Sequence, residues 1–344
     1  MIVKMDRMAT KGQKDKVVAR IKALGLDAAE IVGTERSVLG VRGDVSKIHE
    51  DQLRLPGVQD VYRISKNYKL ASKEYHQHVN GKSSYTSFTV GNLSIGNGKL
   101  VIMAGPCTVE SEEQIMASAR AIKEAGGDIL RGGAFKPRTS PYAFEGLGEE
   151  GLALLAKARD KYGLPVVTEI MSEAQLPLFE KYDIDIIQVG SRNGRNFHLL
   201  NELGKQKRPV FLKREMGTLL EEWLLCAERI MSHGNTKVIL CERGITTFEK
   251  YTRNTLDLNS VAAIKYELSH LPIFSDPSHG TGRRNLIMPM SLASVAAGAD
   301  GLMIEMHPRP EEALTDAFQQ VTPETLAVII RKARAMHTAV RDET

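Results

Sequence analysis

The stretch Leu100–Gly133 reads LVIMAGPCTVESEEQIMASARAIKEAGGDILRGG, and it decides the fold. Its first six residues form the short apolar run typical of a buried strand. The segment SEEQIMASARAIKEAGG then places apolar residues at helical spacing and ends in glycines, which favour a helix C-terminus. A second apolar run, DILRGG, follows directly. The stretch therefore predicts one strand–helix–strand unit.

The same alternation continues toward the C-terminus. We count eight apolar runs, each followed by an amphipathic helical pattern; the six after Gly133 are PVVTEI, DIIQVG, PVFLKR, KVILCER, PIFSDP and GLMIEM. Nearly continuous apolar strands are typical of a parallel sheet buried on both faces. Eight such units favour an α/β fold of the closed (β/α)₈ type, the TIM barrel, over the alternative of an open doubly wound sheet.

The residues before the barrel follow a different order. Strand, helix, strand, strand, helix and strand patterns succeed one another, with the second helix expected over residues 45–56. This order predicts a small ferredoxin-like βαββαβ domain over residues 1–66. We interpret polar residues 67–86 as a linker. The barrel domain then covers residues 87–344 and begins with a β-hairpin, FTVGNLSIGNGK.

Composition narrows the class of protein. With 344 residues, 42 % of them hydrophobic, 26 % charged and a net charge of +4, the chain resembles an ordinary globular protein and gives no signal for nucleic-acid binding. No apolar run approaches the ~18 residues that a membrane span needs, and charges interrupt the N-terminus, so we expect a cytoplasmic protein. Three cysteines without metal-finger spacing make a disulfide framework unexpected.

The predicted barrel strands all end in polar or ionisable residues, at the rim where barrel enzymes carry their active sites. Burying an unpaired cation is costly, so cations at these positions need anionic partners. Guanidinium forks and ammonium groups match carboxylates and phosphates. Taken singly, each cation could belong to a structural ion pair; together they indicate an anion site formed by Arg131, Lys136, Arg192, Lys213 and Arg243.

A second set of residues has metal-ligand chemistry. Cys107, His279 and Glu305 follow strands one, seven and eight, which become neighbours when the barrel closes, and Asp316 lies in the loop after strand eight. A thiolate, an imidazole and two carboxylates suit a divalent transition metal such as Mn, Fe, Co or Zn better than Mg or Ca. Individually, each has an ordinary structural interpretation; their predicted convergence makes them candidate ligands.

Several motifs carry a resemblance to a known family: AGPCTVES, LRGGAFKPRTSPYAFEGLG, VVTEIM, QVGSRN, CERG, RNTLD and DPSHGTGRR. Over nearly the whole chain they resemble the 3-deoxy-D-arabino-heptulosonate 7-phosphate (DAHP) synthases, in the type I beta subclass with a ferredoxin-like regulatory domain. The sister family, which makes 3-deoxy-D-manno-octulosonate 8-phosphate, typically reads KANRS where this chain has KPRTS at residues 136–140. The resemblance implies condensation of phosphoenolpyruvate with erythrose 4-phosphate and water, the first step of the shikimate pathway.

The resemblance also implies roles for individual residues. Phosphoenolpyruvate would be bound by Arg131, Lys136, Arg192, Lys213 and Arg243. The phosphate of erythrose 4-phosphate would be bound by Arg138 and Thr139. Catalytic roles would fall to Lys136, Glu169 and Lys213, with the acid and base undecided between the last two. The metal ligands would be Cys107, His279, Glu305 and Asp316. The family usually reads LKRG where this chain has LKRE, so Glu215 leaves the path of that loop open.

For the assembly, the resemblance implies a homotetramer with tyrosine or phenylalanine as feedback ligand of the N-terminal domain. A dimerisation module without a ligand is the structural alternative for that domain. For the barrel, the alternatives are an octulosonate 8-phosphate synthase acting on arabinose 5-phosphate and a non-catalytic sugar-phosphate sensor. KPRTS argues against the first, and the full set of metal and cation positions argues against the second.

Overall fold

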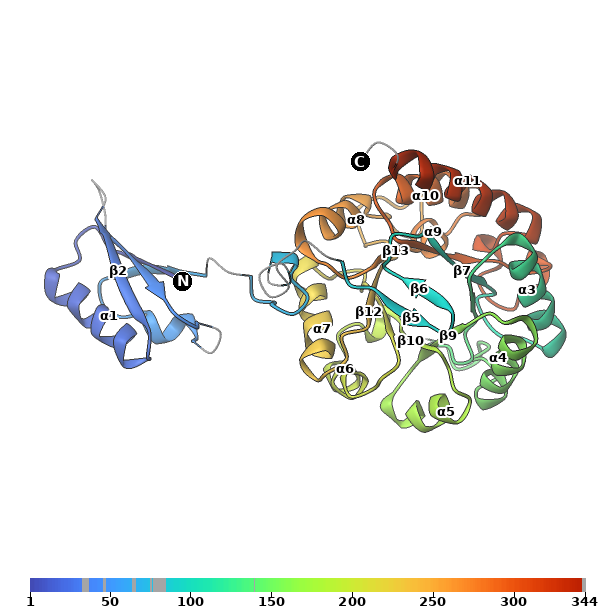
Figure 1. The fold of residues 1–344 in the computed structure, drawn as a ribbon, viewed down its shortest axis with the longest axis horizontal. Helices are drawn as coiled ribbons and strands as arrows, with labels where there is room; N and C mark the ends of the chain where they lie inside the picture. Colours follow the sequence, from blue (N-terminus) through green and yellow to red (C-terminus); the bar gives the residue numbers. More distant parts are fainter. Residues whose placement is uncertain are drawn as a thin grey trace. The chain divides into compact units, whose positions relative to one another are not determined.

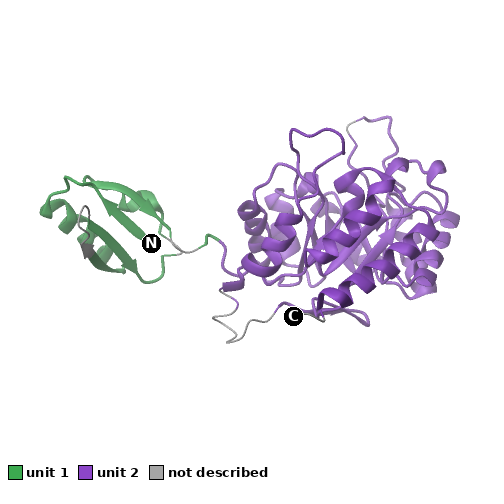
Figure 2. Cartoon of the chain, turned by 90° about the horizontal axis from the view of Figure 1, so that it is seen from above, with its two compact units in different colours: residues 1–67 green, residues 68–344 purple. Residues whose placement is uncertain are grey.

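The computed structural model describes residues 1–32, 37–45, 48–63, 66–74, 76, 85–138 and 140–341. The chain divides into two compact units, residues 1–67 and residues 68–344 (Figure 2). Among the helices in these described ranges, none combines the length and apolarity that crossing a bilayer demands.

The first unit is an antiparallel sheet with helical cover. Its elements are β1 (Ile2–Met5), α1 (Lys11–Ala23), β2 (Asp27–Val32), β3 (Ser37–Arg42), η1 (Glu50–Leu53) and β4 (Val58–Tyr62). The strand order is β2-β3-β1-β4, with every pair antiparallel. Val3, Leu39 and Val61 from the sheet pack against Val17 and Ile21 of α1. The predicted ferredoxin-like fold is confirmed.

The helix predicted over residues 45–56 is wrong in extent. Only the single 3-10 turn η1 forms within the described part of that range, from which residues 46 and 47 are missing. His49 has extended backbone angles, and Arg54 has already left the helical region. Pro56 explains the early end, because a proline disfavours helical geometry at the residue before it and cannot donate a helical hydrogen bond.

The second unit is a closed barrel of eight parallel strands (Figure 1). In chain order the strands are β7 (Val101–Gly105), β8 (Ile129–Arg131), β9 (Val166–Ile170), β10 (Ile186–Val189), β11 (Val210–Lys213), β12 (Val238–Glu242), β13 (Ile273–Ser275) and β14 (Gly301–Glu305). The sheet closes because β14 pairs with β7 along its whole length. The predicted TIM barrel is confirmed and the open sheet is excluded.

Helices surround the barrel (Figure 1). They are α3 (Glu112–Ala125), α4 (Glu149–Tyr162), α5 (Leu176–Lys181), α6 (Phe197–Gly204), α7 (Leu220–Ser232), α8 (Leu258–Ala263), α9 (Pro277–Thr281), α10 (Arg284–Ala296) and α11 (Pro323–Arg341). Short helical turns are η2 (Glu173–Gln175), η3 (Ser191–Asn193), η4 (Ile264–Leu268), η5 (Pro310–Glu312) and η6 (Ala317–Gln319).

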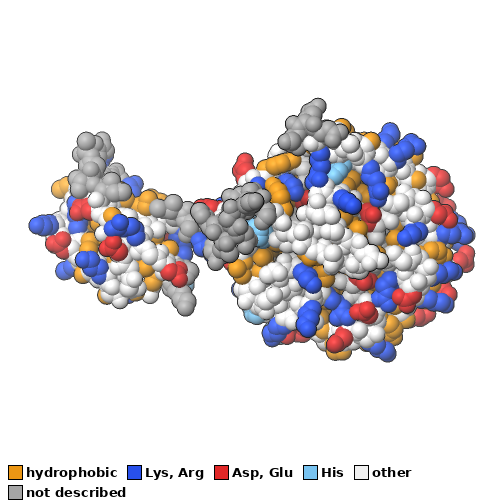
Figure 3. Space-filling view, in the orientation of Figure 1, with side chains coloured by type: hydrophobic (Ala, Val, Ile, Leu, Met, Phe, Trp, Pro, Cys, Tyr) orange, Lys and Arg blue, Asp and Glu red, His pale blue; other side chains and the backbone are white. Residues whose placement is uncertain are grey.

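The barrel interior is packed, not hollow. Alternate strand residues such as Val101, Met103 and Phe211 point into one inner cluster, while Ile102 and Leu212 belong to the larger cluster beneath the helices. The hairpin β5 (Phe88–Val90) and β6 (Leu93–Ile95) closes the amino-terminal end of the barrel, because Val90 and Ile95 join the inner cluster. Charges of both signs are interspersed around this hairpin face (Figure 3).

The described part of the expected linker lies against the barrel. Tyr68 and Ala71 are buried, and the backbone amides of Leu70 and Ala71 donate to the carboxylate of Glu228 in α7, at 3.0 and 2.8 Å. His270 contacts the carbonyl of Leu70 through Nε2, at 2.6 Å. Residues 68–71 are therefore anchored to the outside of the barrel domain.

Candidate active site

The carboxyl ends of the strands surround an open pocket. Seven cations and two carboxylates line it, which gives the pocket an excess of positive charge; they are Arg131, Lys136, Arg138, Arg192, Lys213, Arg243, Arg253, Glu169 and Asp316. A concave site with this balance of charge suits an anionic ligand. All five cations of the predicted anion site are among the lining residues.

Two buried guanidinium groups in this pocket have unsatisfied donors. Arg131 and Arg243 are each 3 % exposed, and among the described residues no atom accepts a hydrogen bond from the Nε of either one. Nη1 of Arg131 donates to Glu305 Oε1 at 3.0 Å and to the carbonyl of Pro106 at 2.5 Å. For Arg243 the one acceptor within the described ranges is the carbonyl of Gly244, 3.5 Å from Nη1. Since buried donors are normally paired, this geometry points to an anion.

Arg131 and Arg243 differ in how far nearby acids compensate their charge. Burial lowers the pKa of the Arg243 guanidinium, because the charged form has lost its water. No carboxylate forms an ion pair with Arg243 within the described ranges, whereas Arg131 is paired with the buried Glu305. Arg243 is thus the less compensated of the two cations and the one that gains most from a bound anion.

Lys213 ends strand β11 and is held by a buried acid. Its Nζ donates to Oδ2 of Asp276 at 2.5 Å, and the two side chains are 4 % and 0 % exposed. Burial alone would raise the pKa of the Asp276 carboxyl, but the charges of His279 and Lys213 hold it well below its ordinary range. Asp276 was missing from the predicted site. The sequence did contain a signal for it, because Asp276 stands at the end of a buried strand, three residues before the candidate ligand His279.

This chain reads LKRE where the family usually reads LKRG, and Lys213 nevertheless lines the pocket. Glu215 turns outward and pairs with Arg195, at 2.5 and 2.8 Å. Arg214 points the other way, into the wall, where its Nη1 donates to Glu242 at 2.9 Å and to Asp257 at 3.0 Å. Arg214 does not line the pocket and acts as a structural ion-pair residue.

Glu169 enters the pocket near the end of β9. The side-chain amide of Gln188 donates to its Oε2 at 2.9 Å. On the other side lies Gly190, where an added Cβ would fall 1.9 Å from Oε1 of Glu169. Only glycine leaves room for this carboxylate, so Gln188 and Gly190 together fix its position.

The loop after β8 brings two more cations. Nζ of Lys136 donates to the Sγ of Cys107 at 2.9 Å, and Nε of Arg138 donates to the carbonyl of Phe144 at 3.1 Å. Arg192 also lines the pocket, from an exposed position in η3. Thr139, the other predicted ligand of erythrose 4-phosphate, lies outside the described residues.

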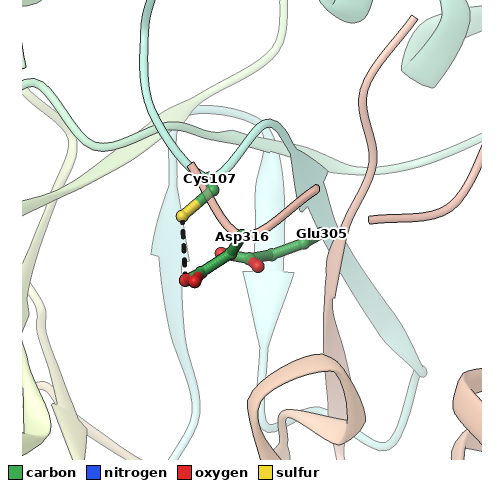
Figure 4. A group of neighbouring side chains, drawn as sticks. All are labelled: Cys107, Glu305 and Asp316. Carbon is green, nitrogen blue, oxygen red and sulfur yellow. Dashed lines mark hydrogen bonds between the residues drawn. The ribbon is translucent and has the colours of Figure 1, made fainter. Parts of the chain in front are cut away.

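Three of the four predicted metal ligands converge beside the pocket. The donor atoms of Cys107, Glu305 and Asp316 all lie within 4.8 Å of one another (Figure 4). Cys107 and Glu305 are fully buried, and Sγ of Cys107 lies 3.5 Å from Oδ2 of Asp316. Asp316 has a left-handed backbone with φ of 47°, a conformation that costs energy for a residue with a Cβ.

His279, the fourth predicted ligand, lies in α9, outside this group of three. Its Nε2 lies 3.5 Å from Oε1 of Glu305, and its Nδ1 lies 2.7 Å from Oδ2 of Asp276. Because an ionised carboxylate only accepts, Nδ1 carries a proton; burial lowers the pKa of His279, and in the neutral imidazole Nε2 keeps a lone pair on the side of Glu305. A carboxylate behind the imidazole is the usual support of a metal-binding histidine.

Burial and neighbouring charges together set the pKa values in this cluster. Burial, together with the charge of Glu305, raises the pKa of the Cys107 thiol to about 11. Burial also raises the pKa of the Glu305 carboxyl, but the charges of His279 and Arg131 lower it by more, so that the pKa is about 2. A soft thiol, an imidazole nitrogen and two carboxylates make a donor set that fits a transition-metal ion.

Two further residues near these ligands escaped the sequence pattern. Arg253 lines the pocket, pairs with Asp316 at 3.4 Å and donates to Gln319 at 3.0 Å. The side-chain amide of Gln319 donates to Oε2 of Glu305 at 2.6 Å. Arg253 belongs to the RNTLD motif, so the sequence contained a signal for it. Gln319 lies in a polar loop and belongs to no motif, so the sequence contained no signal for it.

Known proteins resemble both units. A phospho-2-dehydro-3-deoxyheptonate aldolase of Thermotoga maritima is 46 % identical over 99 % of this chain and 98 % of its own length. The crystal structure of the T. maritima enzyme, also named DAHP synthase, matches with a TM-score of 0.90 at 45 % identity over 98 % of this chain and 97 % of that one. A 2-dehydro-3-deoxyphosphooctonate aldolase of Geobacter sulfurreducens is 31 % identical over 74 % of this chain and 98 % of its own.

Family membership rests on two matches that together span nearly the whole sequence. Residues 1–66 match the DAHP synthase ferredoxin-like domain. Residues 70–340 match the DAHP synthetase I family, and this region holds the pocket, its cations and the ligand cluster. The chain belongs to the DAHP synthetase I family.

Proposed function

We propose that this chain is a metal-dependent DAHP synthase, which condenses phosphoenolpyruvate with erythrose 4-phosphate and water to give DAHP and phosphate. A carbon–carbon bond forms between C3 of the enol phosphate and the aldehyde carbon. Water adds at C2, and phosphate leaves with cleavage of its bond to that carbon. The residues of the pocket would serve binding, electrostatic stabilisation and proton transfer in these steps.

Phosphoenolpyruvate carries a phosphate and a carboxylate, and the pocket offers cations for both. We assign its binding to Arg131, Lys136, Arg192, Lys213 and Arg243. The unpaired Nε atoms of Arg131 and Arg243 support the assignment, since an anion would satisfy them. Arg138 and Thr139 are proposed to bind the phosphate of erythrose 4-phosphate, with Arg138 reaching the same pocket from the adjoining loop.

The proposed metal ligands are Cys107, His279, Glu305 and Asp316. A divalent ion such as Mn, Fe, Co or Zn held there would supply Lewis acidity toward the aldehyde oxygen. Lys136 contacts the thiol of Cys107 and also lines the substrate pocket, so substrate and ligand cluster adjoin. This adjacency suits a reaction that needs both an electrophile and an anion held nearby.

Water must be oriented and protons moved at C2. Glu169, held by Gln188, and Lys213, held by Asp276, both line the pocket. We assign the proton transfers to this pair, with Lys136 as the third catalytic residue. The two groups have fixed positions before substrate arrives, which favours general acid–base catalysis.

The observation that carries this proposal is the buried guanidinium of Arg243, whose Nε has no acceptor among the described residues, in a cation-lined pocket. Calorimetric titration with phosphoenolpyruvate tests it. Arg243→Met should lose at least about 100-fold in affinity, as expected when one partner of a buried charged contact is removed. Arg208→Met is the matched control, since Arg208 pairs with Asp183 at an exposed site away from the pocket. Equal affinities in both variants would contradict the proposal.

For the N-terminal domain we propose binding of tyrosine or phenylalanine and feedback inhibition, within a homotetramer. The match of residues 1–66 to a domain particular to DAHP synthases supports this assignment. The test compares inhibition of the full chain with that of a chain lacking residues 1–66. A truncated T. maritima DAHP synthase has a solved structure that 79 % of this chain matches, which makes the deletion practical. Inhibition that persists after deletion would support a dimerisation module.

A further inference from the structure

We infer that two consecutive glutamines, Gln319 and Gln320, are positioning residues of the ligand cluster, each holding a different candidate metal ligand. Both side chains are 0 % exposed, although they follow a polar loop at the rim of the barrel. The inference rests on the proposed metal site and adds residues that lie behind the ligands. Neither glutamine is a proposed ligand itself.

Gln319 fixes the carboxylate of Glu305. Its Nε2 donates to Oε2 of Glu305 at 2.6 Å, which leaves Oε1 on the side of His279, 3.5 Å from that ring. The two oxygens of Glu305 are therefore not equivalent. Oε2 accepts from a neutral amide, whereas Oε1 accepts from the guanidinium of Arg131 at 3.0 Å and lies on the side of His279.

The orientation of the Gln319 amide is itself determined. Its Oε1 accepts from Nη1 of Arg253 at 3.0 Å, and a guanidinium can only donate, so Nε2 must be the atom that faces Glu305. The same guanidinium pairs with Oδ2 of Asp316 at 3.4 Å. Gln319 and Arg253 thereby connect Glu305 to Asp316 through two hydrogen bonds and one ion pair, without contributing a ligand.

Gln320 fixes the third ligand. Its Oε1 accepts from the backbone amide of Cys107 at 3.1 Å, and its Nε2 donates to the carbonyl of Thr315 at 2.8 Å. Gln320 thus joins Cys107 to Thr315, the residue before Asp316. A single side chain spans the two loops that supply the thiol and the second carboxylate.

Other contacts hold the same two loops together, so the glutamines act within a rigid frame. The hydroxyls of Thr108 and Thr315 lie 2.7 Å apart, and Oε1 of Glu110 accepts from the backbone of Leu314 at 3.0 Å. These contacts fix the loops as a whole. In addition to these contacts between the loops, Gln319 contacts the side chain of Glu305, and Gln320 contacts the backbone amide of Cys107.

Glutamine is the residue type that this place requires. Glu305 and Asp316 are already two carboxylates in a buried space, so a third acid there would add repulsion, while an apolar side chain would donate nothing. Residues that support metal ligands in this way typically contribute 10- to 100-fold to metal affinity, an order-of-magnitude range. A loss of that size is expected when either amide is removed.

The test is a titration of the full-length, metal-stripped protein with Co²⁺. The near-ultraviolet charge-transfer band from the Cys107 thiolate reports binding without any assay of activity. We compare wild type with Gln319→Met and Gln320→Met, which keep side-chain length but lose the amide, and with the shorter Gln319→Asn. The control is Asn235→Ala, which removes a buried amide that bonds the carbonyls of Leu203 and Arg208, away from the pocket.

We expect the glutamine variants to bind Co²⁺ about 10- to 100-fold more weakly than wild type, while Asn235→Ala binds it normally. Thermal unfolding without metal should change no more in the glutamine variants than in the control. Wild-type affinity in folded Gln319→Met or Gln319→Asn protein, with the band unchanged, would overturn the inference while leaving the metal site intact. Absence of the band in wild type would instead refute the metal site and the inference with it.

Discussion

The Nζ of Lys213 and the carboxylate of Asp276 meet at 2.5 Å, with both side chains almost completely buried. The same carboxylate lies 2.7 Å from Nδ1 of His279. One acid thus supports a cation of the proposed phosphoenolpyruvate site and an imidazole of the proposed metal site. The two halves of the catalytic centre share a single buried anchor, and disturbing it should disturb both.

Asp276→Asn should therefore affect binding, catalysis and stability together. Leaving Lys213 buried without its acid is expected to cost about 3–5 kcal/mol in the free energy of unfolding. Loss of the carboxylate behind His279 should weaken metal binding by about 10- to 100-fold. Denaturant unfolding and Co²⁺ titration measure the two effects. Asp27→Asn, in an exposed pair with Arg42, is the control and should cost about 0–1 kcal/mol.

Arg243→Met should weaken phosphoenolpyruvate binding and yet stabilise the protein without substrate. The guanidinium is 3 % exposed, its Nε is unpaired, and burial lowers its pKa, so the folded chain bears a cost for this charge. Replacing it by an apolar side chain of similar length should increase the free energy of unfolding by about 1–3 kcal/mol. Denaturant unfolding of the two proteins provides the measurement. A destabilised Arg243→Met would show that the charge is compensated in the folded state.

Gly190→Ala should reduce turnover through Glu169. The new methyl group would lie 1.9 Å from Oε1 of Glu169, so the carboxylate must move away from its bond with Gln188. Displacing a general acid–base group typically costs about 10²- to 10⁴-fold in kcat. Gly217→Ala is the control, because an added Cβ there meets nothing within 4 Å and Gly217 is exposed. Equal kcat values in the two variants would show that Glu169 takes no part in the proton transfers.

Acid should weaken the attachment of residues 68–71 through His270. Burial lowers the pKa of His270 from 6.5 to about 4, so the folded protein binds this proton less readily than the unfolded chain. The neutral form contributes its full stability above about pH 6.5 and loses it as the pH falls toward about 4. The shift corresponds to a loss on the order of 3 kcal/mol.

Urea unfolding across this pH window, for wild type and His270→Gln, isolates the contribution. The slope of unfolding free energy against pH should be shallower in His270→Gln, because the glutamine can still contact Leu70 and Thr86 but does not titrate. Parallel curves for the two proteins would assign the acid sensitivity to other groups.

Local sequence pattern predicted the architecture well because each barrel strand is a continuous apolar run with its own turn signals. The pattern failed over residues 45–56, where Pro56 limits the helix to the single turn η1. In the site, cations at strand ends were recognisable because their positions in the strands required anionic partners. Asp276 and Gln319 were not assigned, since their partners Lys213 and Glu305 lie 63 and 14 residues away and become their neighbours only in the folded chain.

The central claim is a metal-dependent condensation with erythrose 4-phosphate, and phosphoenolpyruvate consumption tests it most directly. Chelator-treated protein is assayed before and after Mn²⁺ is restored, with erythrose 4-phosphate and arabinose 5-phosphate as parallel acceptors. We expect consumption only with metal and with a strong preference for erythrose 4-phosphate. Full activity in the chelated protein, preference for arabinose 5-phosphate, or no turnover with either acceptor would contradict it.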